Sequence, residues 1–81
     1  MAQRSDLIEW VYEAIVEQGG EATLVEVAKH IWSHHEADLK RSKKLLYTWQ
    51  YDMRWAATQL RADGRLAAAG NTPKGIWALK R

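Results

Sequence analysis

The sequence predicts an α+β domain in which three helices precede a C-terminal β-hairpin. Two observations support this prediction. Apolar residues recur at helical spacing in three separate stretches before residue 63, and after it two short segments flank a turn rich in Gly, Asn and Pro. A chain of 81 residues is expected to form one domain with a modest core.

The first helix is predicted to begin at Ser5 and to end at the Gly19-Gly20 pair, which is typical of a C-terminal cap. Glutamates lie on one side of this stretch and apolar residues on the other. The apolar residues are Leu7, Ile8, Val11, Ala14 and Ile15.

The second helix is predicted to begin at Thr23, because Thr23 and Glu26 have the spacing of a capping box. Its buried stripe is expected to consist of Leu24, Val27, Ala28 and Ile31. We expect residues 21–23 to be extended and the helix to end near His35. The polar residues 36–42 would then connect it to the third helix.

The third helix is predicted over residues 42–62, where Asp63-Gly64 terminates it. Residues 65–70 and 76–80 then flank the turn NTPKG as the two arms of a hairpin. Three helices followed by a hairpin is the order of a winged helix-turn-helix domain. We therefore expect a single winged-helix domain over residues 1–81, with the third helix as recognition helix and the hairpin as wing.

The third helix has two different faces, which explains the aromatic density of YTWQYDMRWAA, residues 47–57. At about 100° per residue, one arc is apolar and suited to the core. It contains Leu46, Trp49, Met53, Ala56, Ala57 and Leu60. The opposite arc has no acidic residue and contains Lys43, Tyr47, Gln50, Tyr51, Arg54, Thr58 and Arg61.

The side chains of this second arc are those that a DNA-reading helix needs. Arg bonds guanine, Gln bonds adenine, Thr offers a methyl and a hydroxyl, and Tyr reaches phosphate or stacks on sugars and bases. We expect Gln50, Tyr51, Arg54 and Thr58 to reach base edges and Tyr47 to lie beside them. The residues expected to neutralise phosphates are Lys40, Arg41, Lys43, Lys44, Arg61 and the wing residue Lys74.

The same residue types are also enriched at protein interfaces, so a second hypothesis is a protein-interaction or dimerisation module without nucleic acid. In that case the face of Tyr47, Tyr51 and Arg54 would dock another protein or a second copy. Alternatively, the two tyrosines would pack under the second helix or the wing. We expect Trp55 to pack against the hairpin.

The net charge of +2 conceals a strong asymmetry along the chain. Residues 1–38 contain two basic and eight acidic residues, a net charge of −6, whereas residues 39–81 contain ten basic and two acidic residues, a net charge of +8. This asymmetry predicts a polyanionic partner on the basic side. Arg65, Lys80 and Arg81 would extend that side or simply be solvated. A solvated charge distribution without a partner is the alternative for the whole pattern.

Several function classes lack their signatures in the sequence. It has no Gly-rich phosphate loop, nucleophile elbow or HExxH motif, and it has no cysteine. We expect a protein that is not an enzyme, takes no cofactor or small-molecule substrate, and lies in the cytoplasm rather than in a membrane. Glu26, His30 and His34 recur every four residues, but without a fourth ligand we expect no metal site. His34 and His35 would instead be surface histidines near phosphate.

The segment RWAATQLRADGRLAAAGNTPKGIWALK, residues 54–80, resembles the end of the N-terminal winged-helix domain of Mrr-type restriction endonucleases. The resemblance rests on Trp55-Ala56, on Leu60, on the GRL at residues 64–66 and on the KGIWAL at residues 74–79. Residues 19–28, GGEATLVEVA, are similar to helix-turn-helix modules of restriction, chromatin and RNA polymerase accessory proteins. The resemblance implies DNA binding. No nuclease domain follows within the 81 residues, so it implies no catalytic residue, and its Trp and Leu positions are expected to determine the fold.

Overall fold

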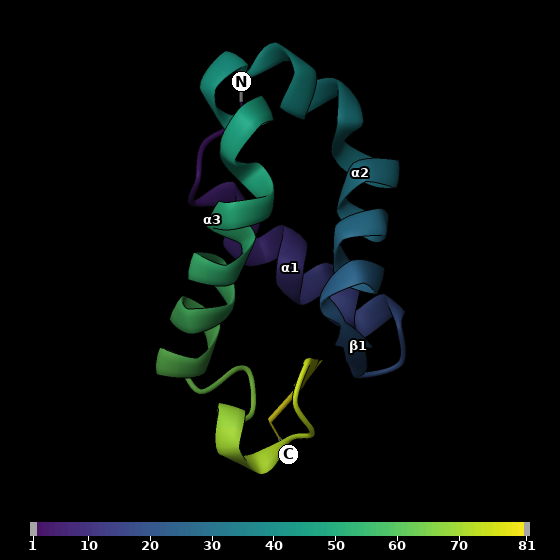
Figure 1. Ribbon diagram of the computed structural model, residues 1–81, viewed down its shortest axis with the longest axis vertical. Helices are drawn as coiled ribbons and strands as arrows, with labels where there is room; N and C mark the ends of the chain where they lie inside the picture. The colour runs from purple at the N-terminus through teal and green to yellow at the C-terminus, as the bar shows by residue number, and fades with distance from the viewer. Residues whose placement is uncertain (1, 81) are drawn as a thin grey trace.

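Three helices and a small antiparallel sheet make up the computed structural model, which describes residues 2–80 and, at Ala69, the backbone alone (Figure 1). The elements follow the chain in the order α1 (Asp6–Glu17), β1 (Glu21–Thr23), α2 (Leu24–Arg41), α3 (Lys43–Ala62), the 3-10 helix η1 (Ala69–Asn71) and β2 (Ile76–Ala78). The predicted α+β class is confirmed. No helix within residues 2–80 is long and apolar enough to cross a membrane.

The ends of α1 and the start of α2 form as their residue types predict. Gly19 and Gly20 both have positive φ, and the Gly20 N–H donates to the Ile15 carbonyl at 2.9 Å, which satisfies an end carbonyl of α1. At the start of α2 the capping box is complete. The Glu26 N–H donates to the Thr23 hydroxyl at 3.2 Å, and the Thr23 N–H donates to the Glu26 carboxylate at 2.8 Å.

The helix α2 is interrupted at His35, near its predicted end, where the backbone is non-helical with φ −130° and ψ 17°. The residues after this kink differ from the prediction, because residues 36–41 are helical and not a connector. The His35 ring stacks on Trp10 of α1, with centroids 3.9 Å apart, and Leu39 beyond the kink is fully buried. Both contacts attach the second half of α2 to the body of the domain.

The core lies between the three helices, with α1 in contact with both α2 and α3 (Figure 1). The stripe predicted for α3 is confirmed from Trp49 to Leu60, but Leu45 is buried and Leu46 only half-buried. Leu45 lies four residues before Trp49 and therefore on the same face of the helix, whereas Leu46 lies to one side of it. The largest fully buried side chains are Leu7, Ile15, Ile31, Leu39, Met53, Leu60, Leu66, Val11 and Val27.

The predicted hairpin is present only in part. β2 pairs with β1 rather than with residues 65–70, in an antiparallel register that sets Ala22 opposite Trp77. The predicted first arm of the hairpin pairs with the second arm through a single antiparallel bridge, between Leu66 and Leu79. The Ala67 N–H also donates to the Ala78 carbonyl at 2.8 Å. The second arm of the predicted wing is therefore a strand of the sheet with β1, and the first arm contributes only a very short pairing.

Candidate nucleic-acid interface

The second arc of α3 is exposed, as its residue types predict. Tyr47 is 86% exposed and Tyr51 80% exposed, so neither ring packs under α2 or under the C-terminal segment. This excludes the packing alternative for both tyrosines. Lys43, Gln50, Arg54 and Thr58 are exposed as well. The residues predicted to contact base edges thus share one exposed face of the helix.

Two residues of this arc are less available than expected. Arg61 is half-buried, and its Nε atom is buried without a hydrogen-bond partner among the described residues, so we correct its assignment as a freely exposed cation. The Thr58 hydroxyl donates to the Arg54 carbonyl at 3.1 Å. Thr58 therefore offers a methyl group and an acceptor oxygen to a ligand, rather than a free donor.

The exposed face of α3 carries no carboxylate. The single acidic residue of α3, Asp52, is half-buried on the flank, where its Oδ2 accepts a hydrogen bond from the Thr48 hydroxyl at 2.9 Å. A carboxylate on the face itself would repel a phosphate-lined groove. The position and bonding of Asp52 leave Arg54 and the lysines of the first turn as the charges that a ligand meets.

The predicted basic run spans the junction of α2 and α3. Lys40 and Arg41 end α2, and Lys43 and Lys44 begin α3. Lys40 differs from the others, because its Nζ lies 2.6 Å from the Glu36 carboxylate. Cations at the start of a helix oppose its dipole, whose positive end favours anions. An anionic ligand at this junction would relieve that opposition.

Lys74 is exposed in the turn that precedes β2. In this turn Gly75 has a φ of +83°, and the Ile76 N–H donates to the Pro73 carbonyl at 3.1 Å. Figure 1 shows the α2–α3 junction at one end of the long axis and the segment from η1 to β2 at the other. The predicted phosphate contacts therefore flank the exposed face of α3 from both ends rather than forming one patch.

Arg4 is a cation near this face that the sequence did not indicate. Its guanidinium lies 4.0 Å from the centre of the Trp55 ring, so Trp55 is covered by the N-terminal segment. Arg4 also borders a hollow that is lined by Lys43, Lys44 and Tyr47. No periodicity could have predicted this contact, because it depends on the N-terminal segment folding back onto α3.

One cation from the basic half of the chain, Arg65, is paired with an acidic residue of α1. Arg65 donates to the Glu9 carboxylate at 2.8 and 3.3 Å, and its guanidinium lies 4.2 Å from the centre of the Tyr12 ring. The hydrogen bond from Arg65 lowers the pKa of Glu9. Arg65 is thus a structural residue rather than part of the basic footprint. Lys80 is exposed, and Arg81 lies outside the described residues.

The three histidines form an aromatic cluster. The rings of His30 and His34 stack with centroids 4.0 Å apart, and the Nδ1 of His34 lies 2.9 Å from the His30 carbonyl. Burial, reinforced by the neighbouring His34, lowers the pKa of His30. Residues 2–80 contain no group of three or more His, Cys, Asp or Glu side chains placed to hold a metal ion.

Comparison with known proteins identifies no relative of this chain. No family model matches the chain, and neither a curated protein nor a solved structure is significantly similar to it. Any functional conclusion therefore rests on the residues themselves.

Proposed function

We propose that this protein binds double-stranded DNA, with α3 in the major groove and the segment before β2 on the neighbouring backbone, in the manner of a winged helix-turn-helix domain. Gln50, Tyr51 and Arg54 would reach base edges, with Thr58 contributing its methyl group. Lys43, Lys44 and Arg41 would contact phosphates at one end of the helix, and Lys74 at the other.

The observation that carries this proposal is the exposed face of α3. A guanidinium, an amide and two largely exposed phenol rings stand there without a carboxylate, between cations at both ends. Aromatic rings held in water do not stabilise a monomer by burial, so their position favours a ligand. The resemblance to the N-terminal domain of Mrr-type endonucleases supports the same function. Such binding would suit a transcription regulator or a DNA-associated accessory protein in the cytoplasm.

The proposal is tested by titrating the ¹⁵N-labelled protein with a short duplex DNA at low and at near-physiological salt. We expect amide shifts along α3 and in the turn before β2, and weaker binding at the higher salt concentration. Arg54→Ala should weaken binding by about 1–3 kcal/mol if Arg54 contacts a base. Lys29→Ala removes one charge from α2 outside the proposed face and should change affinity much less.

A duplex that perturbs no α3 amide at low salt would contradict the proposal. So would equal losses from Arg54→Ala and Lys29→Ala, since these would indicate attraction by net charge alone. If sedimentation instead showed a salt-insensitive dimer that Arg54→Ala dissolves, the face would be a dimer interface.

A further inference from the structure

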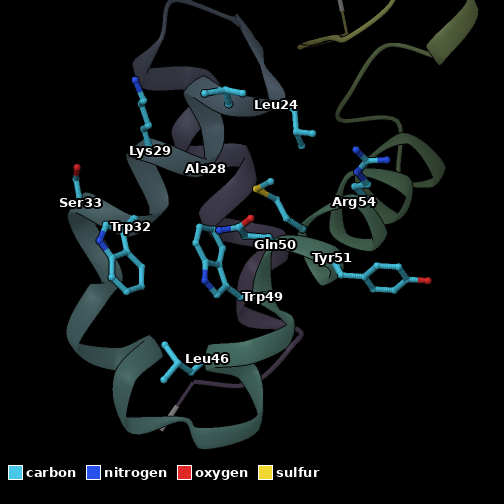
Figure 2. A pocket seen from close by; sticks show the side chains of 12 residues that line it. Leu24, Ala28, Lys29, Trp32, Ser33, Leu46, Trp49, Gln50, Tyr51 and Arg54 are labelled. Carbon is cyan, nitrogen blue, oxygen red and sulfur yellow. The ribbon is translucent and has the colours of Figure 1, made fainter.

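The space between α2 and α3 forms an open apolar groove with a volume of about 950 Å³ (Figure 2). Figure 2 shows the Trp32 and Trp49 side chains between the two helices and Tyr51 pointing away from them. The two indole rings are nearly parallel, with centroids 6.0 Å apart. The floor of the groove is apolar and consists of Leu24, Ala28, Trp32, Leu46, Trp49 and Met53.

The groove exists because α2 carries two apolar stripes. Val27 and Ile31 are fully buried in the core. Three other residues of α2, spaced four apart, are only half-buried and line the groove: Leu24, Ala28 and Trp32. The sequence predicts that Leu24 and Ala28 belong to the core stripe. Their spacing of four residues continues to Trp32, and this continuation indicates a second apolar stripe on α2. A half-buried Trp in such a small domain leaves apolar surface that a partner can cover.

We propose that this groove binds an amphipathic helix with acidic flanks, supplied by another protein. Two helices form its walls, so its shape suits a third helix that lays an apolar face between them. This inference does not depend on DNA binding.

The charges around the groove specify the flanks of the partner. Lys29 on α2 and Arg54 on α3 stand on opposite walls of the groove, and neither forms an ion pair with a carboxylate among residues 2–80. No Asp or Glu is among the residues that line the groove. Glutamates or aspartates on both sides of an apolar stripe would therefore be complementary to it.

The same charges argue against a second copy of the chain as occupant. A groove-to-groove dimer would bring Lys29 and Arg54 of both copies together, which is unfavourable. The described helices also bury their main apolar faces in the domain's own core, so none of them is free to fill a neighbour's groove. An external helix satisfies both conditions.

The groove shares Gln50, Tyr51 and Arg54 with the proposed DNA-reading face. If the proposed function holds, a helix seated in the groove would therefore compete with DNA. Binding of the helix itself can be measured without DNA, so the two proposals fail separately.

The test uses three synthetic helical peptides of about 18 residues, which corresponds to roughly five turns. The first has a leucine stripe flanked by glutamates, the second has the same stripe flanked by lysines, and the third has the composition of the first with its leucines scattered. We expect the whole protein to bind the first peptide about tenfold more tightly than either of the others, as measured by calorimetry.

A matched pair of variants locates the site. Val25 is 60% exposed at the groove, and Val16 is 45% exposed on α1 away from it. Val25→Glu should weaken binding of the first peptide about tenfold, whereas Val16→Glu, which adds the same charge, should change it less than about twofold. Circular dichroism checks that both variants fold.

Three results would overturn the proposal. They are equal affinity for the ordered and scattered peptides, equal effects of the two glutamate substitutions, and a concentration-dependent dimer that Val25→Glu dissolves. The last would identify a second copy as the occupant of the groove.

Discussion

At the scale of single residues, the pair of Glu9 and Arg65 connects α1 to the chain that follows α3. Two hydrogen bonds join the side chains, but the Glu9 side chain is 66% exposed and that of Arg65 35% exposed. Water screens such a pair, so its coupling free energy should be near 0.5 kcal/mol despite the bidentate geometry. The bond from Arg65 lowers the pKa of Glu9, so this stabilisation requires the ionised carboxylate.

A double-mutant cycle of Glu9→Gln and Arg65→Gln measures this coupling. We expect about 0.5 kcal/mol at pH 7 from urea unfolding. Because the pKa of Glu9 is lowered on folding, the contribution is complete above its ordinary value of 4.5 and is lost as the pH falls through the lowered value. The coupling should therefore vanish when the pH is low enough to protonate Glu9. A coupling that persists there would show that the two side chains interact through packing alone.

At the scale of elements, Ser42 joins three parts of the fold. Its hydroxyl donates to the Asp38 carbonyl at 2.6 Å in the last turn of α2 and accepts from the Ala2 N–H at 2.8 Å. Ser42 is only 8% exposed and directly precedes α3. It therefore ties the N-terminal segment, with Arg4, to the α2–α3 junction.

Ser42→Ala should lower the free energy of unfolding by about 1–2 kcal/mol, because it leaves two polar backbone groups without this partner. Hydrogen exchange of residues 2–5 should accelerate more than exchange in the core of α3. Ser33→Ala, at an exposed position of α2, is the control and should stay within about 0.5 kcal/mol of the parent. Equal effects of both substitutions would mean that the Ser42 hydrogen bonds contribute little.

Local signals predicted the helices wherever a cap or a clear period existed. The glycines after α1 and the capping box of Thr23 are examples, since each depends on residues at most a few positions apart. The continuation of α2 past His35 was not predictable in this way, because the stack on Trp10 links residues that are distant in the sequence. The pairing of β2 with β1 was missed for the same reason: a hairpin pattern indicates two extended segments but not a third.

At the scale of the whole molecule, the wheel of α3 separated its core face from its exposed face except at Leu46 and Arg61, because helical geometry alone fixes most of the two faces. It could not reveal which cations are already paired or partly buried. Lys40 lies against Glu36, and Arg61 is half-buried. Among residues 2–80, Arg41, Lys43, Lys44 and Lys74 form no ion pair with a carboxylate. These four are the strongest candidates for phosphate contacts.

The salt dependence of DNA binding tests how many of these four cations contact phosphates. If the four free cations each neutralise one phosphate, the logarithm of the association constant should fall with the logarithm of salt concentration at a slope of about −3.6. Lys43→Gln should reduce this slope by about 0.9, because one counterion fewer is released. Lys29→Gln removes the same charge from α2, outside the proposed contacts, and should leave the slope unchanged. Equal slopes for both variants would mean that the domain attracts DNA through its overall charge and not through the two ends of α3.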